Sequence, residues 1–272
     1  MQKLAVIMSL YKNDRLEYVK LAVESILNQT YFSFDFYIQF DGMVDANIED
    51  YFTSLSDERV WIQSRAENLG LAKSLNELLE IVRLHDCEYI ARMDADDISL
   101  PFRFERQLDY LSSHPDIDVV GGAINEIDEN GNNRGKITSY PCSTVACKAL
   151  FAKRNPVAHP TVIFRRSFFD KVGWHYPTDF VRNEDTRLWQ EAYKHDCNIA
   201  NLPDVVLNFR ITDEMFEKRR NGRDFARSQL ELRLQIRKDL DYGFMAVVYA
   251  YATFLMQISP AWVKKLCYRY LR

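Results

Sequence analysis

Residues 89–101 of this 272-residue chain read YIARMDADDISLP, and this stretch decides the fold. Its apolar start predicts a short strand that leads directly into the carboxylates of Asp94, Asp96 and Asp97. Ser99 and Pro101 are the residue types that cap and begin a helix. Carboxylates this close together repel and raise one another's pKa, and a divalent cation removes that cost. We therefore expect a Mg²⁺ or Mn²⁺ site at the end of the strand, and the alternative is a solvated acidic turn that begins the helix.

The elements that precede this strand alternate between two patterns. A continuous apolar run at residues 4–8 and largely apolar stretches at 34–40 and 60–62 predict strands buried in a parallel sheet. Apolar residues at helical spacing predict helices over residues 16–28 and 71–82. This alternation is typical of a doubly wound α/β sheet, which binds its ligand in the crevice at the carboxyl ends of its strands. Four polar residues are placed at such ends, and together they indicate a nucleotide site: Ser9, Asp41, Asn68 and Asp94.

The following part of the chain continues the same domain. A helix is expected over residues 104–111 and a strand over 119–127, and Asn130-Gly131 then predicts a hairpin that gives the sheet a mixed edge. Another strand is expected at 161–164, and Glu184-Asp185 opens a further helix. Because no linker or repeat interrupts these elements, we expect residues 1–212 to form one domain and residues 213–272 a C-terminal helical region.

The C-terminal region contains an uncharged stretch, residues 242–263, which nearly equals the length of a membrane span. Gly243 and Pro260 make it a poor span, so a helix lying in the lipid headgroup region fits better. The basic residues that follow would bind anionic lipid, and they are Lys264, Lys265, Arg269 and Arg272. The alternative is a helix that docks on the domain's own core.

Charge and cysteine content exclude several classes of protein. The net charge is −4 and the pI is near 5.8, so nothing in the composition indicates a nucleic-acid partner. The five cysteines are scattered and odd in number, which is typical of reduced thiols. The first apolar run is too short for a signal peptide, so we expect a cytoplasmic protein.

Seven residues are the candidates for the chemistry. Asp96, with Asp94 or Asp97 beside it, would hold a metal that neutralises a departing diphosphate. Asp41 could bind a base or ribose, or belong to an ordinary turn. Asp185, beside Glu184 in a first helical turn, could act as a general base or only cap the helix. His159 and Glu184 could contact the metal or the acceptor, and the alternative for His159 is a structural histidine in a proline-flanked loop.

Several stretches, taken in order, resemble the inverting family 2 glycosyltransferases of the GT-A fold. They are residues 6–11, 25–30, 68–70 with Asn76, 93–97 and 184–185. Further stretches resemble bacterial enzymes that build O-antigen and exopolysaccharide repeat units, namely 155–162, 173–174, 184–189 and 209–210. The resemblance implies a Rossmann-like doubly wound mixed sheet. No Gln-x-x-Arg-Trp motif is present, so processive polymer synthesis is not expected.

The resemblance also implies roles for individual residues. Asp41 would contact uracil, and Ser9 and Tyr11 would line the nucleotide pocket beside Asn68. Asp94 would contact the ribose or the metal, Asp96 would be the principal ligand of Mn²⁺ or Mg²⁺, and Asp185 would be the base.

The implied reaction transfers glucose or galactose from a UDP-sugar in a single displacement with inversion. The implied acceptor is an N-acetylhexosamine on undecaprenyl diphosphate, joined through a β-1,3 linkage. Such enzymes work at the cytoplasmic face of the bacterial inner membrane, which would explain the apolar and then basic C-terminal region.

Two other classes compete with this interpretation. A sugar-nucleotide pyrophosphorylase would need a glycine-rich phosphate loop after the first strand, and residues 9–15 contain no glycine. A non-catalytic scaffold of a membrane assembly complex would keep the fold without needing Asp94, Asp96 and Asp185, all of which are present.

Overall fold

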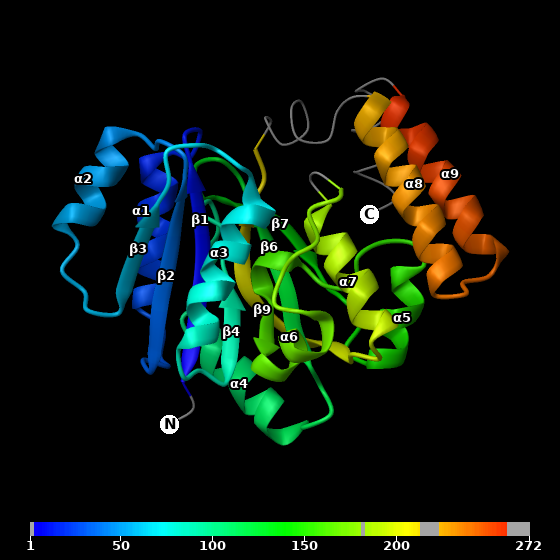
Figure 1. Ribbon diagram of the computed structural model, residues 1–272, viewed down its shortest axis with the longest axis horizontal. Coiled ribbons are helices and arrows are strands. Elements are labelled where there is room, and N and C mark those ends of the chain that lie inside the picture. The colour runs from blue at the N-terminus through cyan, green and yellow to red at the C-terminus, as the bar shows by residue number, and fades with distance from the viewer. Residues whose placement is uncertain (1–2, 181–182, 213–222, 260–272) are drawn as a thin grey trace.

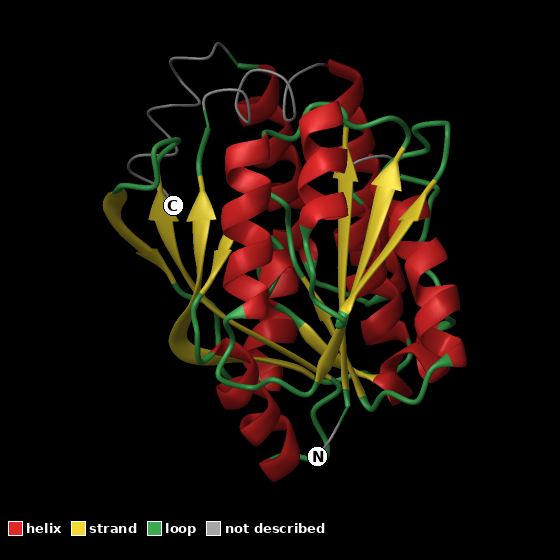
Figure 2. Cartoon of the chain, turned by 90° about the vertical axis from the view of Figure 1, so that its left-hand side faces the viewer, coloured by secondary structure: helices red, strands yellow, loops and turns green. Residues whose placement is uncertain are grey.

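One mixed sheet runs through the molecule and carries helices on both faces (Figures 1 and 2). The structure is a computed structural model that describes residues 3–180, 183–212 and 223–259. Within these ranges the strands are β1 Leu4–Tyr11, β2 Phe34–Asp41, β3 Val60–Ser64, β4 Tyr89–Arg92, β5 Ile98–Ser99, β6 Val119–Ile127, β7 Asn133–Thr138, β8 Ile163–Arg165 and β9 Ile199–Arg210. The helices are α1 Leu16–Leu27, α2 Ala46–Ser54, α3 Leu71–Leu84, α4 Arg103–Ser113, α5 Thr144–Phe151, α6 Arg166–Val172, α7 Glu184–Lys194, α8 Arg223–Asp239 and α9 Phe244–Ile258, with a 3₁₀ turn at His159–Thr161.

The first four strands form the parallel half of the sheet in the order β3-β2-β1-β4. This arrangement confirms the doubly wound α/β prediction for the N-terminal half. Because parallel strands end at the same edge of a sheet, the carboxyl ends of β1, β2 and β4 meet there. The predicted nucleotide-binding residues therefore lie on neighbouring strands or on the loops that leave them.

The other half of the sheet is mixed. β8 pairs antiparallel with β4, and the order continues through β6 and β9 to β5. The hairpin prediction at Asn130-Gly131 is confirmed, since β7 pairs antiparallel with β6 across that turn. The predicted strand at 161–164 begins at Ile163, after the 3₁₀ turn. β9 was not expected, and neither were α2, α5 and α6.

Side chains that alternate along β1 enter two hydrophobic cores, one on each face of the sheet. Val6 and Met8 pack with α1 and α4, whereas Ala5 and Ile7 pack with α3 and α7. A strand with both faces covered has to be apolar throughout, which explains the uninterrupted run from Leu4 to Met8.

The prediction that Ser99 and Pro101 cap and begin a helix is wrong. Ser99 lies in β5, which pairs with β9, and α4 begins only at Arg103. The side chain of Gln29 donates to the Ser99 hydroxyl at 3.1 Å and to the Leu100 carbonyl at 2.8 Å, while the Thr30 amide donates to the Pro101 carbonyl at 2.8 Å. Tertiary hydrogen bonds therefore hold this segment extended and delay the helix.

The helices α8 and α9 form an antiparallel hairpin at one end of the molecule (Figure 1). Leu232 and Ile236 of α8 are buried in the same core as α3 and α7, so α8 docks on the domain. Of the residues of α9, only Ala246 and Ala250 are buried. No helix within the described ranges is both long enough and apolar enough to cross a bilayer. The basic residues Lys264, Lys265, Arg269 and Arg272 lie outside those ranges.

Candidate active site

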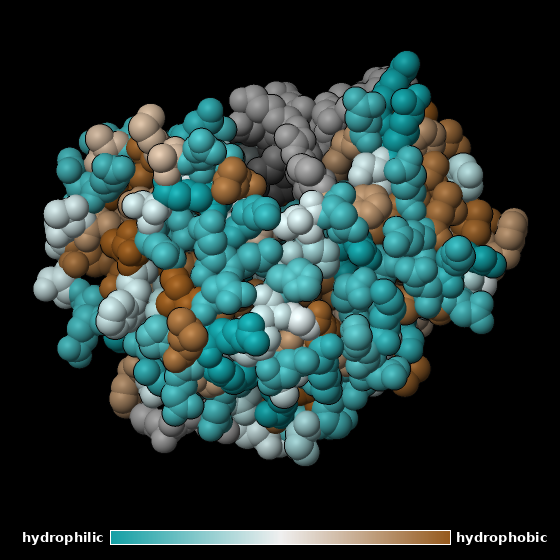
Figure 3. Space-filling model, viewed as in Figure 1, coloured by the Kyte–Doolittle hydropathy of each residue, from teal (hydrophilic) through white to brown (hydrophobic). Residues whose placement is uncertain are grey.

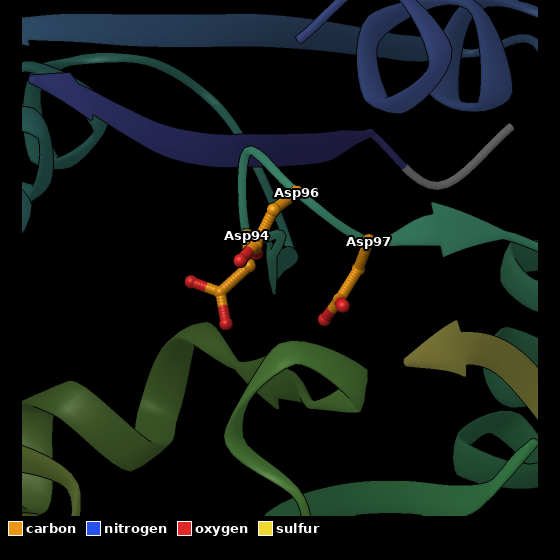
Figure 4. Close-up of side chains that lie close together, drawn as sticks. All are labelled: Asp94, Asp96 and Asp97. Carbon is orange, nitrogen blue, oxygen red and sulfur yellow. The ribbon is translucent and has the colours of Figure 1, made fainter. Parts of the chain in front are cut away.

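The acidic turn after β4 lies at the carboxyl edge of the parallel strands. Carboxylate oxygens of Asp94, Asp96 and Asp97 all lie within 4.8 Å of one another. The three side chains extend from one tight turn toward the same side (Figure 4). The turn therefore collects three carboxylates in a space that a single ion could share.

Three arginines hold this turn in place. Arg92 forms an ion pair with Asp94, and Arg103 donates to the Arg92 carbonyl at 2.8 Å. Arg210, at the end of β9, donates from its side chain to the Asp96 carbonyl at 2.8 Å and from its amide to Asp97 at 2.9 Å. The Arg210 guanidinium also donates to the carbonyls of Asp128 and Glu129 at 3.0 Å. The turn is thus tied to the β6–β7 loop and to β9.

The electrostatics of the cluster favour a bound cation. Asp97 is buried, and that burial, followed by the charges of Asp96 and Asp94, raises its pKa well above the usual range. One oxygen of Asp97 has no hydrogen-bond partner within the described part of the chain. Burial opposes the charge on Arg92, but Asp94 outweighs that effect and raises the pKa of Arg92. Since one arginine compensates three acids only in part, the residues present fit a divalent ion.

Asp41 ends β2 and is tied to the loop that leads into α3. Its carboxylate accepts hydrogen bonds from the amides of Leu69 at 2.7 Å and Gly70 at 2.9 Å, and it pairs with Arg65. The side chain of Asn68 donates to the Asp41 carbonyl at 3.0 Å. The fold therefore brings Asp41 and Asn68, two of the predicted nucleotide-binding residues, into contact. Asp41 also organises the loop between β3 and α3.

The remaining nucleotide candidates lie near the end of β1. Tyr11 is the last residue of that strand and Ser9 lies two residues earlier, so Ser9 is inside the strand rather than at its end. Both side chains are partly exposed. Tyr11 lies at the same edge of the sheet as Asp41, because the two residues are opposite each other in the pairing of β1 with β2. Ser9 lies two residues further into the sheet.

The two acids predicted to open a helix do begin α7, and they have different surroundings. Burial, then the charge of Asp185 and, to a smaller extent, that of Asp94 raise the pKa of Glu184 to about 7, against the opposing effect of Arg92. Asp185 accepts hydrogen bonds from Asn155 at 2.8 Å and from the Thr186 amide at 2.6 Å. Glu184 is thus coupled electrostatically to the acidic turn, whereas Asp185 is held by the loop that contains Asn155.

His159 lies in a cluster of aromatic rings beneath the site. Its Nε2 atom is 3.1 Å from the hydroxyl of Tyr176, and its ring lies edge-on to Trp189. Burial and then Arg92 lower the pKa of His159 well below the usual range. Among the described residues, the group close enough to share an ion consists of the three aspartates and does not include His159. This placement favours the structural alternative for His159.

A model of one protein family matches residues 5–173, and its description is glycosyl transferase family 2. The chain belongs to this family. Amylovoran biosynthesis glycosyltransferase AmsE of Erwinia amylovora is 33% identical over 84% of this chain and 83% of its own length. A UDP-Gal:alpha-D-GlcNAc-diphosphoundecaprenol beta-1,3-galactosyltransferase of Escherichia coli is 28% identical over 84% of this chain and 81% of its own length.

A solved structure supports the fold of this family 2 glycosyltransferase. Residues 1–349 of S. aureus TarS, in complex with UDP-GlcNAc, superpose with a TM-score of 0.64 over 97% of this chain and 84% of that one. The sequence identity is 16%, so this likeness concerns the GT-A-like fold alone.

Sequence reasoning missed four residues around the family 2 site: Arg65, Arg92, Asn155 and Arg233. Arg92 precedes the acidic turn directly and could have been expected to pair with it. Asn155 meets Asp185, and Arg233 meets Asn155, only in the fold, because these residues lie far apart in the sequence. No local pattern distinguishes such residues from ordinary surface polar groups.

Proposed function

We propose that this family 2 glycosyltransferase transfers a hexose, galactose or glucose, from a UDP-sugar to a hydroxyl of an acceptor sugar with inversion. The observation that carries the proposal is the convergence of two acidic groups at one edge of the sheet. The acidic turn of β4 and the first turn of α7 lie close enough for Asp94 to raise the pKa of Glu184. A metal that stabilises the leaving diphosphate and a carboxylate that accepts the proton could therefore both act on one sugar.

Asp96 and Asp94 are the residues that would hold Mn²⁺ or Mg²⁺. When bound, such an ion neutralises the charge that develops on the departing diphosphate. Asp97 completes the cluster from its buried position, and Arg92 and Arg210 hold the turn in place. Ser9, Tyr11, Asp41 and Asn68 would bind the nucleoside along the ends of β1 and β2.

Asp185 would take the proton from the acceptor hydroxyl. The freed oxygen attacks the anomeric carbon, the bond from that carbon to the UDP oxygen breaks, and UDP leaves with the bonding electrons. An α-linked donor then gives a β-linked product. One protein carboxylate suffices because the leaving diphosphate needs no proton, unlike the leaving group of a glycosidase. The position of Asp185 in the first turn of α7 suits a carboxylate, since the helix dipole is positive there.

The proposed acceptor is an N-acetylhexosamine on undecaprenyl diphosphate, used in O-antigen or exopolysaccharide repeat-unit synthesis through a β-1,3 linkage. Support comes from the E. coli relative, which acts on GlcNAc-diphosphoundecaprenol. We further propose that the protein binds peripherally to the cytoplasmic face of the inner membrane through α9. The helix presents large apolar side chains to solvent, visible as the brown right-hand flank in Figure 3, and they are Phe244, Met245, Val248, Tyr249, Tyr251, Leu255, Met256 and Ile258.

We propose that the exposed apolar face of α9 binds an anionic bilayer. The helix itself has no charged residue, and the chain beyond it carries Lys264, Lys265, Arg269 and Arg272. An uncharged apolar helix followed by basic residues suits insertion among anionic headgroups. The buried Ala246 and Ala250 occupy the opposite face, against α8, so the apolar surface is free to contact lipid.

The transferase proposal is tested by a screen of UDP-hexoses against synthetic GlcNAc- and GalNAc-diphosphoundecaprenol with Mn²⁺, in which products are identified by mass and by glycosidase digestion. Asp185→Asn should abolish transfer while UDP still binds in the presence of Mn²⁺. Asp116→Asn, an exposed aspartate away from the crevice, is the matched control and should retain activity. Full activity of Asp185→Asn would remove Asp185 from its role.

The membrane proposal is tested by sedimentation with vesicles of phosphatidylglycerol and phosphatidylethanolamine. Phe244→Gln with Leu255→Gln should release the protein, because two large apolar groups leave the lipid-facing side of α9. The control pair, Leu84→Gln with Ile137→Gln, removes exposed apolar residues elsewhere and should remain bound. Equal vesicle binding by both pairs would exclude α9 as the contact.

A further inference from the structure

The helix α8 contacts the loop that holds Asp185. Arg233 of α8 is partly buried, and its guanidinium donates to the Phe151 carbonyl at 3.0 Å and to the side-chain oxygen of Asn155 at 3.2 Å. Its charge also lies 5.5 Å from the centre of the Phe151 ring. The amide nitrogen of Asn155 in turn donates to Asp185 at 2.8 Å. A chain of two hydrogen bonds thus leads from α8 to Asp185.

The chemistry of these groups determines which way the amide of Asn155 points. A guanidinium can only donate hydrogen bonds, so the group of Asn155 that faces Arg233 has to be the oxygen. The nitrogen then has to face Asp185, where it donates to the carboxylate. Thr186 also contacts the Asn155 oxygen, at 3.0 Å, but a hydroxyl can donate or accept and does not impose an orientation. The carboxylate of Asp185 only accepts and so requires the same orientation from the nitrogen end, while Arg233 fixes the oxygen end and holds the side chain in place.

Two other contacts join α8 to α7, the helix that begins with Glu184 and Asp185. Gln229 donates to Asn183, the residue that precedes α7, and Gln190 of α7 donates to Asp239 at 2.7 Å. Leu232 and Ile236, on the same side of α8, are buried in the core that α7 shares. The contact between α8 and the site is therefore continuous along the helix and does not rest on one side chain.

We propose that Arg233 is a positioning residue for the transfer reaction, and that it acts by orienting Asn155 so that the amide aims Asp185 at the acceptor hydroxyl. In this arrangement the C-terminal hairpin supplies part of the active site and is more than an appendage for membrane binding. The inference rests on the proposed role of Asp185 as base. Without Arg233, the oxygen of Asn155 keeps only the Thr186 hydroxyl as a partner, so the side chain can shift and its hydrogen bond to Asp185 is lost.

The test compares four full-length variants, Arg233→Met, Arg233→Lys, Asn155→Ala and the double variant Arg233→Met with Asn155→Ala. The substrates are the UDP-hexose and lipid-linked acceptor selected by the screen. We expect Arg233→Met to lower kcat about 10- to 100-fold, the effect of losing one well-placed buried hydrogen bond. The KM for the UDP-sugar and the Mn²⁺-dependent affinity for UDP should stay unchanged. Arg233→Lys, which keeps an obligatory donor, should recover part of kcat.

The double variant separates positioning from mere structural support. If Arg233 acts through Asn155, the double variant should be no slower than Asn155→Ala alone, because both changes remove one interaction. Arg227→Met, at an exposed arginine of the same helix, is the control and should match the wild type. Wild-type kcat in Arg233→Met, or losses that simply multiply in the double variant, would overturn the proposal.

A readout independent of turnover distinguishes this inference from the proposed function. Crystal structures of the wild type and of Arg233→Met should show the Asn155–Asp185 hydrogen bond in the first and its loss in the second. Retention of that bond in Arg233→Met refutes the inference whatever the activity. Full activity of Asp185→Asn, measured alongside, would instead refute the role of Asp185 as base and leave the orientation of Asn155 to be decided by the crystal structures.

Discussion

Replacement of Asp41 by asparagine should destabilise the protein as well as weaken nucleotide binding. The two carboxylate oxygens accept from different backbone amides, Leu69 on one oxygen at 2.7 Å and Gly70 on the other at 2.9 Å. Asparagine keeps one oxygen and places an NH₂ group against the second amide. One buried donor is then unsatisfied, and Arg65 loses the charge with which it pairs.

The size of the effect follows from these losses. An unsatisfied buried donor costs about 1–3 kcal/mol, and breaking a buried ion pair costs about 3–5 kcal/mol. Arg65 keeps a second partner, Glu77, at 2.7 Å, so the lower part of the combined range applies. We expect a loss of about 4 kcal/mol in the free energy of unfolding, which corresponds to a fall in Tm of about 8–16 °C in a chain of this size.

Thermal unfolding followed by circular dichroism measures the first effect, and calorimetric titration with UDP and Mn²⁺ measures the second. Because the loop with Asn68 is attached to Asp41, UDP affinity should fall at least tenfold, a loss of about 1.4 kcal/mol. The control is Asp45→Asn, since Asp45 caps α2 and asparagine caps a helix equally well. An unchanged Tm in Asp41→Asn would refute the structural role that we assign to the carboxylate, and weaker UDP binding alone would leave only a contact with the nucleotide.

Three further predictions concern the site and the residues around it. Gly42 has φ +80°, and an added Cβ would lie 2.8 Å from the Asn68 amide nitrogen. Gly42→Ala should therefore lower Tm more than Gly135→Ala, where φ is also positive but the space is open. Equal shifts in Tm would disprove the close contact. Arg210→Met removes the donor to the Asp96 carbonyl and should weaken Mn²⁺-dependent UDP binding about tenfold, the effect of losing one hydrogen bond from a charged group. Unchanged affinity for UDP would argue against a role of Arg210 in holding the turn. The buried His159 has a lowered pKa, so the unfolded chain binds its proton first and stability falls as the pH drops below 6.5, by at most about 1.4 kcal/mol per pH unit. Denaturant titrations from pH 7 to pH 5 should therefore show a shallower fall in His159→Gln, and parallel curves would contradict this.

The two helices of the C-terminal hairpin differ in how they contact the rest of the domain. α8 docks on the domain through Leu232 and Ile236, whereas α9 leaves most of its large apolar side chains in solvent, with Phe244 74% exposed. A truncation after Lys238 would therefore disturb more than a membrane anchor. It would remove Tyr242, whose hydroxyl donates to the Lys148 carbonyl at 2.6 Å, and Asp239, which accepts from Gln190. Substitutions on the exposed face of α9 test lipid binding without that damage.

The elements that the sequence predicted well are those with a repeating local signal. A strand covered on both faces is predominantly apolar, so the unbroken run in β1 and the largely apolar stretch in β2 predicted both strands. The helical spacing of Leu75, Leu78 and Leu79 predicted α3. The acidic turn was recognisable because three carboxylates within four residues repel one another, a cost that a cation removes. In each case the information lies within a few residues of the feature itself.

Only the tertiary structure decided the features that depend on distant partners. Ser99 and Pro101 have the composition of a helix start, yet pairing with β9 and the side chain of Gln29 keep the segment extended, because hydrogen bonds across the fold outweigh a local capping preference. The same holds for the pairing of Arg65 with Asp41 and for the path from Arg233 through Asn155 to Asp185, which joins residues 78 and 30 positions apart in the chain. Hydrogen bonds between such distant groups leave no periodic trace in a single sequence, so the acids of the site could be named in advance but not the residues that orient them.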